Sequence, residues 1–453
     1  MNAWTWVAAG SFVVWLWLLL GHGGFWRTGV RLPDTGARAE GTSAEGAAEV
    51  WPSVAVVVPA RDEAEVLPAS LGSLLAQDYP GRAAVFLVDD GSTDGTGRIA
   101  RELASRAGAL PLTVSSPGDP ELGWTGKLWA VRHGIALARA QKPAPAYLLL
   151  TDADIAHAPD SLRELVRAAR AADLDLVSQM ARLRVETRWE RLIVPAFVYF
   201  FAQLYPFRRV NRPRARTAAA AGGCVLLRND AAARAGVPDS IRHAVIDDVA
   251  LARAVKRGGG RIWLGLADRV DSVRPYPRLA ELWRMVSRSA YTQLRHNPVL
   301  LAGTVAGLTL VYLVPPVALL GGAVAGSPAA AVAAGAAWAV MSGTYVPMLR
   351  YYGQPWWLAP LLPFVASLYL LMTVDSAVQH HRGRGAAWKG RTYPRPDRTE
   401  QPQPRVRPEA QVQPQVRPEA QPQPEPREQR ARSAAPGTPL AAPSPAADES
   451  GAP

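Results

Sequence analysis

Residues 54–94 read VAVVVPARDEAEVLPASLGSLLAQDYPGRAAVFLVDDGSTD. Residues 54–58 form a wholly apolar, mostly β-branched run, which is typical of a buried parallel strand. Residues 63–76 place leucine and valine at helical spacing, and residues 85–88 form a second apolar run that ends in acidic side chains. This order predicts a β-strand, a helix and a parallel β-strand, and such sheets bind ligands beyond the carboxyl ends of their strands.

The acidic side chains after the second strand are Asp89, Asp90 and Asp94. A loop that binds phosphate directly offers glycine amides and a lysine. Carboxylates instead suit ribose hydroxyls, a base N–H or a metal that holds phosphates. The alternative is a turn whose Asp side chains bond the local backbone before a helix begins. This stretch alone leaves both interpretations open.

The composition narrows the class of protein. The chain has 453 residues, a formal net charge of +12 and a single cysteine, Cys224. One cysteine excludes a disulfide within the chain and argues against a cysteine-based zinc site. The basic residues form no stripe interleaved with aromatics, and many lie beside apolar segments, so we expect membrane lipids rather than nucleic acid as the partner.

Residues 3–20 are apolar and uncharged, which predicts an N-terminal transmembrane anchor within residues 1–26. A signal peptide is the rival, but the first five residues hold no basic side chain. Arg27 and Arg31 follow the run, which favours a cytoplasmic location for what comes next. Residues 27–50 are then expected to be a linker.

Three more apolar segments, residues 299–324, 329–349 and 356–374, lie in a predicted C-terminal membrane region, residues 296–378. Three full crossings from a cytoplasmic Arg295 would put the basic residues 380–391 outside, against the positive-inside rule. Either one segment is re-entrant or the rule is broken here, and both stay open. Residues 379–453 are first basic and then rich in Pro and Gln, with VRPEAQ at 406 and at 416, which predicts a disordered tail.

Two further motifs follow predicted elements. Gly123 to Lys127 reads GWTGK and opens a helix, where an anion is favoured. A predicted strand at 147–150 runs into TDAD, so Asp152 and Asp154 are one residue apart and are expected to converge on one Mg²⁺ or Mn²⁺. A capping role is the alternative, but Asp160 is expected to cap the next helix instead.

The later part of the chain adds an acidic pair and two aromatic segments. Asp247 and Asp248 open a predicted helix, where they either cap it or supply a general base. Residues 189–216 are expected to lie at the membrane interface or to form a buried core helix, and both stay open. Residues 279–295 form an amphipathic pattern suited to an interfacial helix.

The motifs PARDE, VDDGSTD, GWTGK, TDAD, AAGG and IDD occur in this order, and a membrane region follows them. This arrangement resembles the family 2 glycosyltransferases, over a domain predicted at residues 51–295. It is most similar to the bacterial hopene-associated glycosyltransferases and more distantly to ceramide glucosyltransferases. The resemblance implies an α/β GT-A fold, with a mixed, mainly parallel sheet, flanking helices and transmembrane helices at both ends.

The resemblance also implies which residues bind a nucleotide-sugar, and these residues come from the four motifs nearest the N-terminus. Asp154 would be the better metal ligand, with Asp152 beside it on the sugar diphosphate, and Lys127 would lie near that diphosphate. The uridine would be held by Pro59, Arg61, Glu63 and Asp89 or Asp90.

Under the same resemblance the catalytic residues would be Asp248 and Asp247, and the chain departs from the family's pattern at two places. Asp248 would match the general base, but Asp247 precedes it where the family usually has Glu. Arg288 would lie in the Q/R-x-x-R-W region of the nucleotide-sugar site, but Ser289 follows it. Losing that motif favours a single transfer over a processive synthase.

The sequence therefore predicts a membrane-bound inverting glycosyltransferase that uses a UDP-sugar, a divalent metal and a lipid acceptor. The resemblance suggests hopanoid or related lipid biosynthesis as its pathway. We expect a multi-pass protein of the inner cell membrane with a cytoplasmic catalytic domain. One alternative is a polyprenyl-phosphate or polysaccharide glycosyl synthase. Another is a catalytically inactive membrane scaffold that keeps a nucleotide-binding fold. The sequence leaves the sugar, the acceptor and the oligomeric state open.

Overall fold

A computed structural model describes residues 2–32, 50–105, 109–383, 387–388 and 391–392. Contacts divide the chain into two units, Met1–Arg395 and Pro396–Pro453, and all described residues belong to the first. Most of the predicted linker and nearly all of the predicted tail, with both VRPEAQ copies, lie outside the described residues.

An eight-stranded mixed sheet forms the centre of the N-terminal half, in the order β3-β2-β1-β4-β7-β6-β8-β5. The strands β3, β2, β1 and β4 pair in parallel, whereas β7 is antiparallel to both of its neighbours. The strands are β1 Val54–Ala60, β2 Ala83–Asp89, β3 Leu112–Ser115, β4 Tyr147–Thr151, β5 Ile155–His157, β6 Leu176–Arg182, β7 Cys224–Arg228 and β8 Ile262–Ser272.

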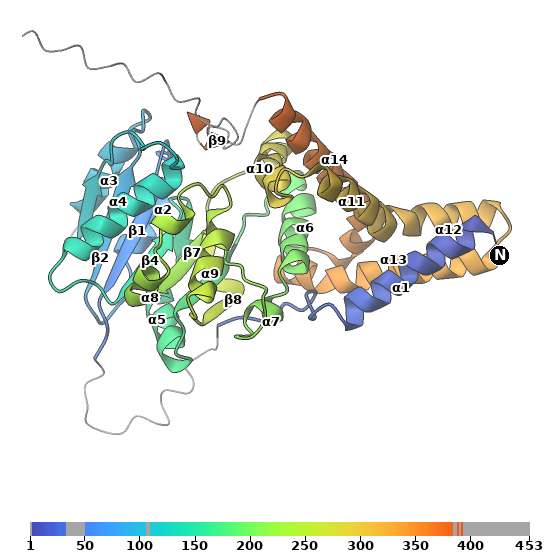
Figure 1. The fold of residues 1–453 in the computed structure, drawn as a ribbon, viewed down its shortest axis with the longest axis horizontal. Helices are drawn as coiled ribbons and strands as arrows, with labels where there is room; N and C mark the ends of the chain where they lie inside the picture. Colours follow the sequence, from blue (N-terminus) through green and yellow to red (C-terminus); the bar gives the residue numbers. More distant parts are fainter. Residues whose placement is uncertain (1, 33–49, 106–108, 384–386, 389–390, 393–453) are drawn as a thin grey trace, which may run out of the picture. The chain divides into compact units, whose positions relative to one another are not determined.

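Helices cover both faces of this sheet, as Figure 1 shows. Alternate residues of β1 point to opposite faces, so Val56 packs into one core with α2 and α5, while Val57 packs into the other with α4 and α9. Both faces are apolar because both are covered. The helices of this half are α2 Leu67–Leu75, α3 Thr96–Ala104, α4 Gly126–Ala140, α5 Ser161–Ala171, α6 Arg188–Leu204, α7 Phe207–Val210, α8 Asn229–Arg234 and α9 Asp247–Arg257, with a 3₁₀ turn at Asp239–Ile241.

Long apolar helices follow α10 and precede the sheet. Four segments are long and apolar enough to cross a membrane: Ala3–Leu20, Pro298–Val324, Pro328–Tyr351 and Trp356–His381. Of these, α1, α12 and α13 pack side by side. The elements are α1 Ala3–Leu20, α10 Leu279–Gln293, α11 Pro298–Leu308, a π-helical turn Thr309–Leu313, α12 Val314–Val324, α13 Pro328–Tyr351, a 3₁₀ segment Trp356–Leu361 and α14 Leu362–His381. A short hairpin pairs β9 Ala387–Trp388 with β10 Arg391–Thr392.

The aromatic segment after β6 is a largely buried helix. In α6, Ile193, Val194 and Tyr199 are fully buried, and the Tyr199 hydroxyl lies 2.8 Å from Thr344 of α13. Leu204, at the end of α6, is 60% exposed. The packing therefore favours the core-helix interpretation for most of this segment. Pro195 lies inside the helix and does not end it.

The predicted fold class, a mixed α/β sheet with flanking helices and apolar helices at both ends, is confirmed. Some boundaries differ. The helix expected from residue 63 begins at Leu67, because the amides of residues 62–64 are bonded by the loop after β2. The strand β5 was not anticipated. Asp160 precedes α5 but makes no side-chain cap, since its carboxylate accepts instead from Arg269 at 3.0 Å.

Candidate active site

The loops after β1 and β2 are joined by hydrogen bonds at the carboxyl edge of the sheet. The amide of Glu63 donates to the Thr96 hydroxyl at 2.8 Å, and the amide of Ala64 donates to the Asp94 carboxylate at 2.8 Å. Asp62, which has a φ of 50°, accepts from the amide of Thr93 at 2.8 Å. These bonds fix the position of the Glu63 side chain relative to the sheet.

The acidic residues after β2 serve this loop structure. Asp89 accepts from the amide of Ser92 at 2.9 Å, which is the local turn that the sequence left as an alternative. Asp90 is 1% exposed, and Arg61 bonds its backbone oxygen and lies 3.4 Å from its carboxylate. A role of these three side chains in binding uridine stays a prediction.

A lysine between two carboxylates forms the first charged cluster. Lys127, in the first turn of α4, lies 2.8 Å from Asp152 at the end of β4 and 3.0 Å from Asp247 at the start of α9. A helix N-terminus disfavours a cation, so these carboxylates stabilise the ammonium where α4 alone would not. Burial would lower the pKa of Lys127, but the charges of Asp152 and Asp247 raise it above its ordinary value.

Asp248 adjoins this cluster without contacting the lysine in an ion pair. Its carboxylate accepts from the amides of Gly222 at 3.0 Å and Val249 at 2.7 Å. Burial, and next the charge of Asp247, raise the pKa of Asp248 to about 7, although Lys127 opposes the shift. A carboxyl group with this pKa exchanges protons near neutral pH, which is the property required of a general base. The two acids of the pair therefore have different environments.

An arginine bridges two acids in the second cluster. Arg274, just after β8, donates to Asp154 at 2.8 Å and also bonds Glu63. Burial would lower the pKa of Arg274, but both carboxylates raise it. Asp152 pairs with Lys127 and Asp154 pairs with Arg274, so the convergence of these two carboxylates on one divalent cation stays a prediction.

The carboxylates of the two clusters supply part of what a divalent metal ion needs. Among the described residues, no group of three or more His, Cys, Asp or Glu side chains could hold an ion. Mg²⁺ is usually bound by one or two carboxylates together with water and substrate phosphates. Asp154 and Asp152 fit that pattern, provided that a phosphate-bearing ligand supplies the remaining oxygens and Arg274 releases Asp154.

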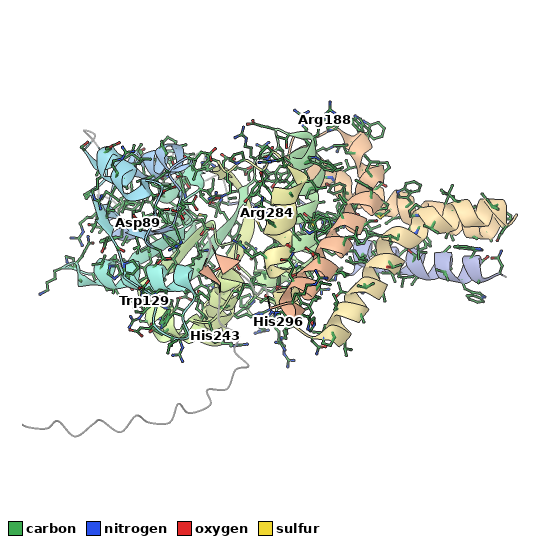
Figure 2. All side chains as sticks on the ribbon, turned by 90° about the horizontal axis from the view of Figure 1, so that it is seen from above. Asp89, Trp129, Arg188, His243, Arg284 and His296 are labelled. Atoms are coloured by element: carbon green, nitrogen blue, oxygen red, sulfur yellow. The ribbon has the colours of Figure 1, made fainter. Side chains whose placement is uncertain are left out.

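One cavity of about 1030 Å³ contains both clusters. Apolar side chains from α6 and α10, among them Phe197, Phe201 and Met285, line another part of it. Arg284 and Arg288, both exposed, lie one turn apart on the same wall, and Figure 2 labels Arg284 on α10 and His296 in the turn after it. The predicted site residues in the lining are Pro59, Glu63, Lys127, Asp152, Asp154, Asp247, Asp248 and Arg288.

Three predicted residues, Arg61, Asp89 and Asp90, lie outside this lining, in the loops that support it. The sequence prediction missed Arg274 and Tyr276, both of which line the cavity. Their only sequence signal is their place directly after the long strand β8, in the run VRPYP. Burial, followed by the charge of Asp154, raises the pKa of Tyr276 to about 12.

Residues 55–235 match the family model described as Glycosyl transferase family 2. This part of the chain is a glycosyltransferase family 2 domain. The match begins in β1 and ends after α8, so it includes Lys127, Asp152 and Asp154. Asp248 and Arg274 lie beyond it. The domain is that of a transferase, and its mixed sheet agrees with the GT-A fold that the resemblance implied.

The glycosyltransferase domain is also similar to curated proteins. It is 29% identical over 144 residues to an N-acetylglucosaminyltransferase of Mesorhizobium japonicum. This match covers 31% of this chain and 31% of that protein. It is 33% identical over 151 residues to the polyprenol monophosphomannose synthase of Mycolicibacterium smegmatis, covering 32% of this chain and 52% of that protein. The chain spans about a third of the length of the first curated relatives that it matches.

Among solved structures, the mannosyltransferase PcManGT from Pyrobaculum calidifontis, in complex with GDP-Man and Mn²⁺, is 22% identical to this chain. The superposition covers 80% of this chain and 99% of PcManGT, with a TM-score of 0.48.

Proposed function

We propose that this protein is a membrane-bound inverting glycosyltransferase that moves a sugar from a nucleotide-sugar to a lipid acceptor. A UDP-sugar is the first candidate for the donor. One observation carries the proposal: a single cavity joins the two charged clusters to apolar side chains of α6 and α10. A nucleotide-sugar suits the charged part, and a lipid suits the apolar part. The four apolar helices support a multi-pass membrane location. We further propose the inner membrane with the catalytic domain in the cytoplasm, because Arg27 and Arg31 follow the first apolar helix.

The chain's own residues have separate roles in the proposed reaction. Asp248 accepts the proton of the acceptor hydroxyl while the oxygen of that hydroxyl attacks the anomeric carbon of the sugar. The bond from that carbon to the diphosphate breaks, and the nucleoside diphosphate leaves with the bond's electron pair. Lys127 supplies a positive charge near the departing diphosphate. A bound Mg²⁺ or Mn²⁺, held by Asp154 and Asp152, would add charge neutralisation at the same place.

A polyprenyl-phosphate acceptor is the second candidate. The exposed Arg284 and Arg288 on the cavity wall favour it, because guanidinium groups bind phosphate in a bidentate manner. The similarity to a polyprenol monophosphomannose synthase supports it as well. A phosphate oxygen is already ionised at neutral pH and needs no general base, so Asp248→Asn would leave transfer to it nearly unchanged.

The full chain, purified in detergent, tests the proposal. It is offered UDP- and GDP-sugars, Mn²⁺ or Mg²⁺, and a lipid extract that contains polyprenyl phosphates and hopanoids, the lipids that the hopene-associated resemblance suggests. Mass spectrometry should find a new glycolipid with native protein and not with Asp154→Ala. Asp160→Ala is the matched control, because Asp160 also pairs with an arginine but lies outside the cavity. If native protein neither binds nor uses any donor, the inactive-scaffold alternative replaces this proposal.

A further inference from the structure

The helix α14 has the length and composition of a membrane span, but its contacts differ from those of α1, α12 and α13. Its segment, Trp356–His381, has a mean hydropathy of 1.8, as high as that of any other candidate span. However, α14 packs mainly against α10. Figures 1 and 2 both show α14 running across the common direction of α1, α12 and α13.

The end of α13 and the end of α14 both lie near the catalytic domain. The preceding helix α13 ends beside the sheet, where the Tyr351 hydroxyl donates to the backbone oxygen of Ala267 in β8 at 2.5 Å. At the other end of α14, Ser376, Gln379 and His380 line the same cavity as Lys127. A helix of 20 residues is about 30 Å long, which is the thickness of the hydrocarbon core. A crossing helix would put its two ends on opposite sides of the membrane.

Polar contacts hold α14 along the catalytic unit. The Trp283 indole of α10 donates to Asp375 at 2.8 Å, and the Ser376 hydroxyl accepts from the amide of Tyr291 at 3.1 Å. Nearer its start, the Tyr369 hydroxyl donates to the backbone oxygen of Ile193 in α6 at 3.2 Å. An aspartate is costly inside a bilayer unless it is paired, and here its partner belongs to the amphipathic helix α10.

The opposite side of α14 is apolar and uncovered in the described chain. Phe364 and Leu371 are each 51% exposed and Val378 is 39% exposed, at intervals of seven residues, which places them on one face. Trp356 and Trp357, just before α14, are 68% and 58% exposed. Exposed tryptophans beside apolar helices are typical of the membrane–water interface. A continuous exposed apolar face of this kind marks a binding surface.

We propose that α14 does not cross the membrane but lies in its plane, with Phe364, Leu371 and Val378 inserted into the lipid on the catalytic side. This inference rests on the membrane location proposed above. Lipid is the occupant that fits, because the candidate spans α1 and α12 also expose large apolar side chains, with Trp17 54% and Leu320 70% exposed. His381 and Arg382 then stay on the side of Arg27 and Arg350, and the conflict with the positive-inside rule disappears.

Labelling of introduced cysteines tests the sidedness. The native Cys224 is fully buried, so it gives a low background. Three single variants of the full chain, Arg98→Cys on α3, Ala325→Cys between α12 and α13, and Arg382→Cys after α14, all replace exposed residues. Sealed inside-out and right-side-out vesicles are treated with a membrane-impermeant maleimide. We expect Arg382→Cys to label from the same side as Arg98→Cys, and Ala325→Cys only from the opposite side.

Two other results would overturn the inference in distinguishable ways. If Arg382→Cys labels together with Ala325→Cys, α14 crosses the membrane while the proposed location stands. If Arg98→Cys and Ala325→Cys label from the same side, the membrane-crossing bundle itself is wrong, and the inference is lost with it.

The depth of the exposed face gives an independent measurement. A bimane group attached at Phe364→Cys, Leu371→Cys or Val378→Cys is quenched by lipids brominated at shallow or deep acyl positions. An in-plane helix predicts the same shallow quenching at all three sites. A spanning helix instead predicts deep quenching at position 371 and shallow quenching at positions 364 and 378, and this result would overturn the inference.

Discussion

At the scale of single residues, the two acids at the start of α9 have different contacts. Asp247 forms an ion pair with Lys127 at 3.0 Å, whereas Asp248 accepts two backbone hydrogen bonds and faces the cavity. Because burial and then the charge of Asp247 raise its pKa, Asp248 holds a proton more tightly than an ordinary carboxyl group. This difference selects Asp248 as the base in the account above.

The raised pKa of Asp248, about 7, predicts how activity and stability depend on pH. Transfer to a hydroxyl acceptor should fall as the pH drops below about 7, because the base becomes protonated. For stability the sign is opposite to that of most carboxylates. The folded state binds this proton more tightly than the unfolded state, so ionisation of Asp248 lowers the free energy of unfolding as pH rises from about 4 to about 7.

Asp248→Asn should therefore raise the melting temperature of the protein more at pH 8 than at pH 5. Thermal denaturation in detergent at both values measures the difference. Asp160→Asn, outside the cavity, serves as the control. An equal change at both pH values would contradict the assigned pKa.

Arg274 competes with a metal ion for the Asp154 carboxylate, since its guanidinium lies 2.8 Å away. Removing this cation should leave Asp154 more accessible to Mn²⁺ even without a nucleotide. Arg274→Gln is thus expected to bind Mn²⁺ more tightly than the native chain, as measured by electron paramagnetic resonance of free and bound metal. Arg269→Gln, which loses the pair with Asp160, should bind as the native chain does. Unchanged Mn²⁺ binding by Arg274→Gln would show that Arg274 does not compete with the metal ion for Asp154.

At the scale of elements, Thr96 at the start of α3 links the two loops at the edge of the sheet. Its buried hydroxyl accepts from the Glu63 amide at 2.8 Å and donates to Asp94 at 2.6 Å. Thr96→Val keeps the shape but leaves that amide without this acceptor, which should cost about 1–3 kcal/mol of unfolding free energy. Chemical denaturation measures the loss, and Thr96→Ser should recover most of it. Equal stability of Thr96→Val and the native chain would refute this role.

The sequence predicted the elements better than it predicted their contacts. The apolar runs at β1, β2 and β4 located the parallel half of the sheet because each is buried on both faces. For Asp89 and Asp94 the sequence leaves turn and ligand roles open. In the structure, Asp89 accepts from the amide of Ser92 and Asp94 accepts from the amide of Thr96 at the start of α3. Arg274 could not be found in this way, because its partners Asp154 and Glu63 lie 120 and 211 residues away in the chain. Only the folded sheet brings them together.

At the scale of the whole described unit, the cavity extends from the sheet edge to α6, α10 and α14, so the proposed donor and acceptor would meet different surroundings. Phe197, from α6, lines the apolar part. Phe197→Ser should raise the KM for a lipid acceptor about 10- to 100-fold and leave donor hydrolysis by water unchanged, because about 1.5–3 kcal/mol of apolar burial is lost. Steady-state kinetics with both acceptors measures this. Leu204→Ser, on the exposed end of α6, is the control, and a parallel loss of hydrolysis would place Phe197 at the donor instead.

The most direct test of the central claim is sugar transfer by Asp248→Asn beside native protein, with donor binding measured on the same samples. The account predicts that the variant binds the nucleotide-sugar as the native protein does but transfers the sugar to a hydroxyl-bearing lipid about 10²–10⁴-fold more slowly. Transfer at the native rate would contradict the assignment of Asp248 as the base. It would point instead to an acceptor, such as a lipid phosphate, that reaches the cavity already ionised.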